Sequence, residues 1–484
     1  MPFPMETASA GNKPSAWKNP SNIHNSRAIQ RLAPHPAVGT VHMTVQEVLP
    51  CVAAGQEHPF PRQGTLRTTK EFLMKDDFPL FWGVTRHFNT ACLENPAQEV
   101  TRLFQSFLPP SSLKEKTVAV CVGSRGIASL PALVKNSIDC LKERGAHVYI
   151  VPAMGSHGGG TAEGQKQLLE GLGITEEAMG VRIRPDMATT EIRRLPNGPT
   201  VRFSSEALKA DFIFPICRVK EHTILTGDVQ SGICKMLVIG CGKHTGAKEY
   251  HKFDIGRTLV PSAEIIIDSV SLLGALAVVE NACDKICAMR IAHPKQFIET
   301  DKELLALART TLPRLPFAEL DALIINEIGK DISGAGADVN VIGKWRREGG
   351  PRTPDYRVLA VLGITPVSHG NATGIGCMDL MPKRLLDIID YDAMRINVLT
   401  SGTFRSARLP LYVDDDKAIL NAILNSVPDS GNISMVRIRN TLALQRFWVT
   451  EKTAGAITSD MRCTIDSAPQ ACQFDAQGVL HEFL

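Results

Sequence analysis

The sequence predicts an α/β protein with two α/β domains, each built on a mainly parallel sheet. Apolar runs such as 117–123 and 356–363 are short and nearly continuous, like strands that are buried on both faces of a parallel sheet. Amphipathic segments with helical spacing lie between such runs, so strands and helices alternate. With 484 residues the chain is too long for one compact core. Since the alternation occurs in two stretches, we expect two domains with the active site in a cleft between them.

The first domain is expected at 66–300 and contains a βαβ unit. Its strand at 117–123 is followed by a polar turn, an amphipathic helix that ends at Gly145 and a second strand at 147–155. A helix at 95–108, with its apolar residues on one face, precedes the unit. Ligands of such sheets bind beyond the carboxyl ends of the strands, so the polar turns after the two strands should lie at the ligand-binding edge.

The second domain is expected at 301–430, with a return segment and tail at 431–484. Its expected elements are strands at 322–328, 356–363 and 396–402, helices around 381–391 and at 416–426, and a closing strand at 434–440. Residues 1–65 are rich in Pro, Ser, Asn and Ala and show little periodicity. We interpret them as a poorly structured, flexible N-terminal extension.

The composition is that of a soluble globular protein. Hydrophobic residues make up 44% and charged residues 21% of the chain, and the formal net charge is +3. No dense block of Lys and Arg occurs, which argues against nucleic acid and membrane surfaces as partners. The chain has no apolar run long enough for a membrane span, no signal-peptide core, and twelve cysteines without regular spacing. We therefore expect a cytoplasmic protein with reduced thiols.

The segment that starts at Cys217 is the strongest candidate for a functional site. Within thirty residues it contains His222, Lys235, His244 and His251. Several glycines between these residues would let backbone and ligand approach closely. Burying an unpaired ammonium or imidazole costs several kcal/mol, so such residues line a site more often than a core. The structural alternative is a loop followed by a buried helix at about 231–239, from which Lys235 reaches water.

Two turns at the expected ligand edge also carry reactive side chains. His157 precedes three glycines, where either a phosphate-binding loop or a strand-to-helix turn with a hydrogen-bonded histidine would fit. Neither GxGxxG nor a P-loop is present, which disfavours NAD or ATP as the principal ligand. Arg125 follows the strand at 117–123, where a guanidinium can hold a carboxylate bidentately, such as that of a 2-hydroxy acid.

These motifs resemble the nickel-pincer lactate racemases and their homologues. In that family a histidine precedes a glycine-rich turn, a lysine follows at the start of a helix, and a second histidine lies sixteen residues beyond the lysine. Lys235 and His251 have this spacing, and His222 precedes them. The resemblance covers about residues 82–453.

The resemblance implies a specific cofactor site. Lys235 would be joined covalently, through a thioamide, to a nickel-pincer nucleotide, a pyridinium mononucleotide whose thioamide and thiocarboxylate groups bind Ni(II). Ser231 and Gly232 would contact this cofactor, and His251 would be the protein ligand of the nickel. His244, seven residues before His251, is the competing metal candidate.

The activity that the resemblance implies is that of an isomerase, a racemase or epimerase that inverts the hydroxyl-bearing C2 of a 2-hydroxy acid. Hydride would move to and from the tethered cofactor, and His157 and His222 would be the catalytic acid/base groups, one for each side of the substrate. For His222 the structural alternative is a turn histidine paired with Glu221. The cofactor-synthesis enzymes would be partners, and an oligomer is compatible with the sequence.

Substrate contacts are expected from both domains. Arg125 would bind the substrate together with Lys330, Asn340 and Lys344, which follow the strand at 322–328, although a solvated loop is the structural alternative there. Better-known family members carry Asp-His-Thr-Arg-Pro around the arginine, whereas this chain has Val-Gly-Ser-Arg-Gly. The change predicts a wider pocket or another hydroxy acid. A longer sugar acid or hydroxydicarboxylate as substrate is one alternative, and a non-catalytic protein that binds a nucleotide or anion is the other.

Overall fold

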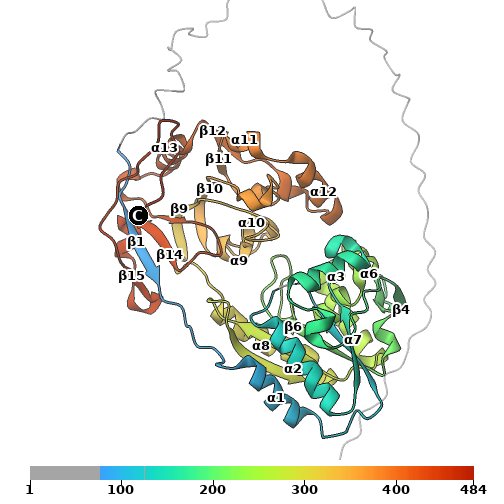
Figure 1. Cartoon of the computed structure of the whole chain (residues 1–484). Coiled ribbons are helices and arrows are strands. Elements are labelled where there is room, and N and C mark those ends of the chain that lie inside the picture. The colour runs from blue at the N-terminus through green and yellow to red at the C-terminus, as the bar shows by residue number, and fades with distance from the viewer. Residues whose placement is uncertain (1–76, 125, 484) are drawn as a thin grey trace, which may run out of the picture. The chain divides into compact units, whose positions relative to one another are not determined.

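The computed structural model describes residues 77–124 and 126–483, which belong to one compact unit, Arg67–Leu484 (Figure 1). The expected N-terminal extension and Arg125 lie outside the described residues. The unit contains two large sheets, one of five strands and one of eight, with helices between the strands in sequence. The α/β class with mainly parallel sheets is therefore confirmed.

The five-stranded sheet has the order β3-β2-β6-β7-β8, and only the last pair is antiparallel. Its strands are β2 (Thr117–Val122), β3 (His147–Pro152), β6 (Phe212–Arg218), β7 (Ala275–Glu280) and β8 (Ile286–Ala292), and a hairpin, β4 (Thr189–Arg194) and β5 (Thr200–Ser204), lies apart from it. The main helices with it are α1 (Pro96–Phe107), α2 (Leu130–Glu143), α3 (Ala162–Gly171), α4 (Glu176–Met179), α5 (Ile233–Lys235), α6 (Lys243–Tyr250), α7 (Ile255–Ser269) and α8 (Phe297–Thr311).

Strand β2 shows why this sheet is buried on both faces. Val118 and Val120 belong to the apolar core that contains α1 and α2, whereas Ala119 and Cys121 belong to the core that contains α5, α7 and α8. Side chains of a strand alternate between faces, so a continuous apolar run is needed when both faces are covered. The predictions of a strand at 117–123 and of a helix at 95–108 are confirmed by β2 and α1.

The eight-stranded sheet has the order β12-β11-β10-β9-β13-β14-β1-β15, parallel from β12 to β13 and antiparallel from β13 to β15. Its strands are β1 (Phe81–Arg86), β9 (Glu319–Ile325), β10 (Asp355–Val361), β11 (Leu380–Pro382), β12 (Leu411–Val413), β13 (Met435–Ile438), β14 (Arg446–Thr450) and β15 (Cys463–Ile465). The main helices with it are α9 (Val339–Ile342), α10 (Trp345–Glu348), α11 (Leu385–Ile388), α12 (Tyr391–Ser401), α13 (Asp416–Ser426) and α14 (Glu451–Gly455).

The prediction of a strand at 396–402 is wrong, because these residues form the second half of α12. Asp390 caps the helix by accepting a hydrogen bond from the backbone N–H of Ala393, and Gly402 ends it in a left-handed conformation. Met394 and Val398, one turn apart, are the buried positions. A short apolar run does not distinguish a strand from a helix, and here the cap and the terminal glycine decide.

Two buried charged side chains, Arg437 and Asp416, form hydrogen bonds that hold the C-terminal residues against the eight-stranded sheet. Arg437 donates hydrogen bonds to Asn326 Oδ1 (2.7 Å) and to the carbonyl of His481 (2.9 Å). Asp416 is 1% exposed and accepts hydrogen bonds from Arg384 (2.7 Å) and from the backbone N–H of Leu480 (2.9 Å). These bonds hold residues around 480 beside β13 and α13.

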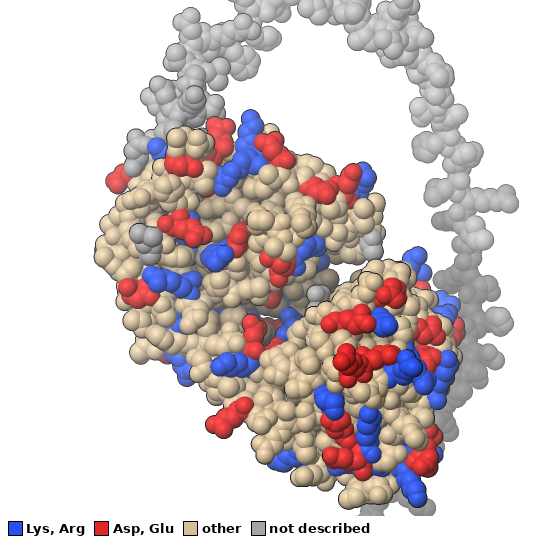
Figure 2. All heavy atoms as spheres, viewed as in Figure 1, with Lys and Arg blue, Asp and Glu red and all other residues tan. Residues whose placement is uncertain are grey.

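Among the described helices, none is long and apolar enough to cross a membrane. On the face drawn in Figure 2, Lys and Arg side chains are interspersed with Asp and Glu side chains.

We predict that Asp416→Ala lowers the free energy of unfolding by about 3 kcal/mol, because it leaves the Arg384 guanidinium and the Leu480 N–H without their buried acceptor. Urea unfolding followed by tryptophan fluorescence would measure this. Asp414→Ala, at an exposed position two residues away, is the matched control and should change the value by less than about 0.5 kcal/mol. Equal effects of the two substitutions would contradict the role of Asp416.

Candidate functional site

Polar residues follow three neighbouring parallel strands of the five-stranded sheet. Ser124 comes after β2, His157 follows β3 and His222 follows β6. The chain goes from β2 to β3 on one side and returns with β6 on the other side of β2. The carboxyl ends of these strands therefore surround a point where the strand order reverses, which is where open α/β sheets bind ligands.

His157 lies in a tight turn that requires glycine. It precedes the single turn η1 (Gly158–Gly160), and its Nδ1 is hydrogen-bonded to Ser124 Oγ at the end of β2. Gly158 has a φ of +64°, and a Cβ there would lie 2.6 Å from the carbonyl carbon of Gly164 in α3. Gly158 thus lets the turn lie directly on the start of α3, with His157 just before it beyond the end of β3.

Lys235 is the last residue of the short helix α5, whose first N–H groups are bound by a buried carboxylate. Asp301, which is 1% exposed, accepts hydrogen bonds from the backbone N–H groups of Ile233 and Cys234, both at 2.8 Å. A Cβ on Gly232 would lie 2.2 Å from Asp301 Oδ1, so only glycine fits there. Burial raises the pKa of Asp301 to about 6, although the two N–H groups oppose this. Lys235 ends α5 and is followed by the π-helical turn η3 (Met236–Gly240), so the predicted buried helix at about 231–239 is present in this form.

Residues after Lys235 pack against the His157 turn. The backbone N–H of Gly155 donates to the carbonyl of Gly240 (3.2 Å), and a Cβ on Gly240 would lie 2.7 Å from the carbonyl oxygen of Ala153. A Cβ on Gly123 would lie 3.1 Å from Cε of Met236. The anchor segment, which we define as residues 231–251, is therefore held against the turns after β2 and β3. Ser231, the first residue of this segment, forms an isolated antiparallel β-bridge with Lys220.

The hydrogen bonds of His222 fix its tautomer. Its Nδ1 accepts the backbone N–H groups of Ile224 (3.1 Å) and Leu225 (3.2 Å), so the neutral ring carries its proton on Nε2. Burial lowers the pKa of His222 most, and nearby cations lower it further, to about 2. Among these cations, Lys235 makes the largest contribution. The other cations are Lys220, Lys344 and Arg347. In the absence of ligand, His222 is a neutral hydrogen-bond donor.

Two of the three residues expected from the second stretch reach the surroundings of His222. Lys344 Nζ donates to the carbonyl of Leu225 (3.2 Å). Arg314 donates to the carbonyl of Asn340 (3.2 Å) and pairs with Glu221, the neighbour of His222. Asn340 Oδ1 is buried and has no hydrogen-bond partner among the described residues.

Lys330 instead contacts its own loop and the loop that follows β10. Its Nζ donates to the carbonyl of Gly334 (2.8 Å) and its backbone N–H donates to Ser368 Oγ (2.7 Å). Burial, with a smaller contribution from Arg347, lowers the pKa of its ammonium. The Arg347 guanidinium also contributes to the lowered pKa of His222, so Lys330 and His222 are both influenced by this cation.

His251 and His244 lie in different surroundings. His251 is exposed at the end of α6, where neighbouring protein atoms lower its pKa by desolvation. The ring of His244 packs on the His157 turn, because a Cβ on Gly160 would lie 2.9 Å from its Nδ1. The described residues contain no cluster of three or more His, Cys, Asp or Glu side chains that could hold a metal ion. A metal at His251 would therefore need further donors from a bound cofactor.

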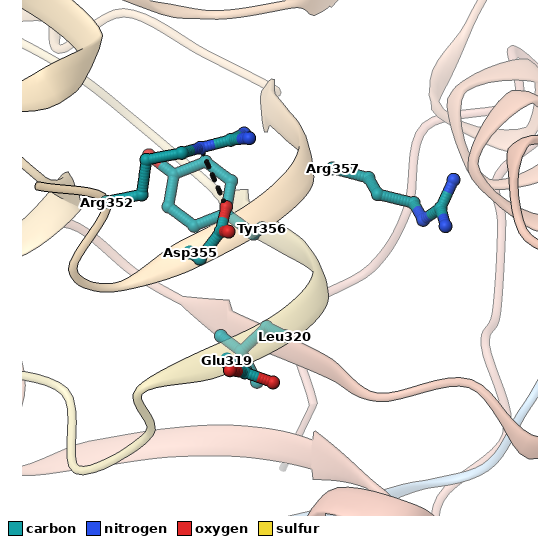
Figure 3. Close-up of a pocket in the computed structure, with 6 residues that line it drawn as sticks. All are labelled: Glu319, Leu320, Arg352, Asp355, Tyr356 and Arg357. Atoms are coloured by element: carbon teal, nitrogen blue, oxygen red, sulfur yellow. Dashed lines mark ion pairs between the residues drawn. The ribbon is translucent and has the colours of Figure 1, made fainter. Parts of the chain in front are cut away.

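A separate surface hollow lies at the start of β9 and β10. It is lined by Glu319, Leu320, Arg352, Asp355, Tyr356 and Arg357. Figure 3 shows the ion pair between Arg352 and Asp355 across it, with Arg357 directed away. Because these residues are at the amino ends of the strands, the hollow is on the opposite edge of the sheet from the loop that carries Lys330.

Sequence reasoning missed three buried polar residues of this site, namely Asp301, Lys243 and Gln165. For Asp301 a signal existed. It lies on α8 at helical spacing from the buried residues Phe297 and Leu305, so it is an acidic residue in an apolar stripe. Lys243 and Gln165 have no such local pattern.

Comparisons with known proteins give partial matches. Residues 122–309 match a family described as "Domain of unknown function (DUF362)", which is less than half of the chain. Among solved structures, the lactate racemase apoprotein from Thermoanaerobacterium thermosaccharolyticum matches with 13% sequence identity and a TM-score of 0.44, covering 74% of this chain and 88% of that one. A comparison with curated proteins finds no match. We therefore argue the function from the residues themselves.

We predict that the effect of Asp301→Asn on stability depends on pH. The folded pKa of about 6 exceeds the ordinary 3.8, so the protonated carboxyl stabilises the fold at acidic pH and this contribution is lost as the pH rises through about 6. The asparagine cannot titrate. The substitution should therefore be about 2 kcal/mol more destabilising at pH 4.5 than at pH 7, measured by urea unfolding.

Asp268→Asn on α7 is the control for this measurement. Its carboxylate is exposed, and the substitution should have little effect at either pH. A difference between Asp301→Asn and the parent that is the same at both pH values would contradict the assignment.

Proposed function

We propose that this protein is a racemase or epimerase that inverts C2 of a 2-hydroxy acid with the help of a nickel-pincer nucleotide tethered to Lys235. The observation that carries the proposal is the anchor segment. It holds Lys235 at the end of a short helix that Asp301 caps, and it packs against the turn of His157 through Gly240. His251 follows sixteen residues after Lys235, at the end of α6. These features support the roles that the sequence resemblance implies, namely a lysine anchor, an acid/base group and a metal ligand.

The residues of this chain fit such a cofactor. Lys220, Lys344 and Arg347 are cations near His222, and such a group of charges suits a phosphate. His251 would be the single protein ligand of nickel, and imidazole suits nickel beside sulfur donors. When bound, the group supplies a hydride acceptor next to the substrate.

The two histidines would have different tasks. His157 has Nδ1 held by Ser124, and it would exchange the hydroxyl proton of the enantiomer whose hydroxyl faces it. With the carboxylate held in place, inversion turns the C2 oxygen of the keto acid towards His222, so the proton of the other enantiomer would reach the oxygen on that side. His222 would donate a hydrogen bond from Nε2 to a substrate oxygen, because its Nδ1 already accepts two backbone N–H groups. Lys344, with Arg125, would bind the carboxylate.

One observation favours a longer acid over lactate as the substrate. Besides Lys235, whose charge the tether would remove, three cations lower the pKa of His222, and the carboxylate next to it, on Glu221, is already engaged by Arg314 and Arg309. A site with this excess of positive charge would bind a ligand with more than one anionic group better than a small monoanion. A sugar acid or a hydroxydicarboxylate has the required chemistry.

We predict that protein made together with cofactor-synthesis enzymes gains mass at Lys235, and that Lys235→Ala abolishes the gain while Lys248→Ala, at an exposed position of α6, keeps it. Elemental analysis should find that His251→Ala loses nickel and His244→Ala retains it. Intact mass spectrometry without any increment in the parent would favour the alternative of a non-catalytic nucleotide- or anion-binding protein. Nickel loss in His244→Ala alone would reassign the ligand.

We predict unequal effects of glutamine at the two histidines. His157→Gln should lower the inversion rate by about 10²–10⁴, as expected for loss of a proton-transfer group. His222→Gln keeps an N–H donor and should lose much less. Chiral analysis of a panel of 2-hydroxy acids and sugar acids measures both rates. Equal losses would mean that His222 also transfers a proton.

A further inference from the structure

Lys243 is a buried cation that the proposed reaction does not use. It is 0% exposed, and among the described residues no carboxylate forms an ion pair with its ammonium. Burial lowers its pKa, which shows how poorly this position solvates the charge. Its backbone also has a φ of +55°, a left-handed conformation that favours glycine. Both features are unfavourable for lysine, so the side chain must provide something that a smaller residue would not.

The ammonium of Lys243 makes two hydrogen bonds. It donates to the carbonyl of Pro152, the last residue of β3 (2.5 Å), and to Oε1 of Gln165 on α3 (3.4 Å). Gln165 is also 0% exposed. Since Oε1 accepts from the ammonium, the amide nitrogen must face the other way.

The amide nitrogen of Gln165 holds the turn that carries the candidate base. Nε2 donates to the carbonyls of Gly155 (2.9 Å) and His157 (3.3 Å). A chain of hydrogen bonds therefore runs from Lys243 through Gln165 to the backbone of His157. The imidazole ring of His157 is in turn hydrogen-bonded to Ser124.

We infer that Lys243 is a positioning residue for His157 and that it acts through Gln165. Lys243 lies eight residues after Lys235 and eight before His251, on the same anchor segment. The segment that would carry the cofactor thus also sets the orientation of the base. This inference rests on the proposed function only in calling His157 a base; the positioning itself is a property of the protein without cofactor.

The test uses the reactivity of His157 in the full-length apoprotein. Carbethoxylation by diethyl pyrocarbonate is followed residue by residue by peptide mass spectrometry across a pH series, with His147, exposed at the opposite end of β3, as internal reference. Lys243→Met and Gln165→Met should each raise the His157 rate by about fivefold or more, because a released turn no longer holds Nδ1 on Ser124 and leaves it free to react. The double variant should match the single variants, since both act through one chain of bonds.

Gln165→Glu separates positioning from packing. It keeps the side-chain volume and offers Lys243 an ionic partner, but it removes the donors to Gly155 and His157. Its His157 rate should therefore rise as in Gln165→Met, while the rate at His147 stays constant. Lys248→Met on the exposed face of α6 is the matched control and should leave both rates unchanged.

A His157 rate within about twofold of the parent in Gln165→Glu and Gln165→Met would overturn the inference. Additive effects of Lys243→Met and Gln165→Met would also overturn it, because they would mean separate routes. In loaded enzyme, the same variants should lower kcat with little change in KM. The labelling result does not depend on cofactor, so a failed positioning role and a failed assignment of function give different outcomes.

Discussion

The candidate site depends on one interaction, the acceptance of two backbone N–H groups by the buried carboxylate of Asp301. A helix as short as α5 is not stable by itself, because nucleation fixes several residues for very few hydrogen bonds. The carboxylate replaces the missing partners and determines where the helix begins. Gly232 is then required because any side chain would overlap the carboxylate. The place of Lys235, at the last residue of α5, follows from these two facts.

Beyond the start of α5, close backbone contacts fix the position of the following residues against the turns after β2 and β3. The turn η3 lies so near Ala153 and Gly155 that residue 240 has no room for a Cβ. Lys243 and His244, farther along the same segment, contact Pro152 and Gly160 on either side of His157. The segment that begins near Lys235 and the turn of His157 are consequently parts of one packed body, although about eighty residues separate these two side chains in sequence. Catalysis between a tethered group and a base needs such fixed geometry, since small displacements cost large factors in rate.

The sequence predicted the fold where the pattern was local. Strands β2 and β10 and helices α1, α2 and α13 follow from periodicity and turn residues, which act within a few positions. The failure at α12 has the same origin, because the three apolar residues at 396–402 suit either a strand or a helix until a cap decides. Asp301 and Gln165 could not be recognised because their partners lie far away in the chain. Each of them forms hydrogen bonds with backbone groups that would otherwise be buried without a partner. Only the tertiary structure shows which backbone groups these are.

The tautomer of His222 separates its chemistry from that of His157. For the ring to become a cation, Nδ1 would have to carry a proton towards two N–H groups that now point at it, and four positive side chains oppose the added charge. A bound anion removes the second obstacle but not the first. Anionic ligands would therefore raise the pKa of His222 without making it an effective proton carrier, unless the loop from Ile224 to Leu225 moves. The two imidazoles are thus inequivalent by construction, and a substrate approaching from the side of His222 would receive a hydrogen bond where the other side offers a base.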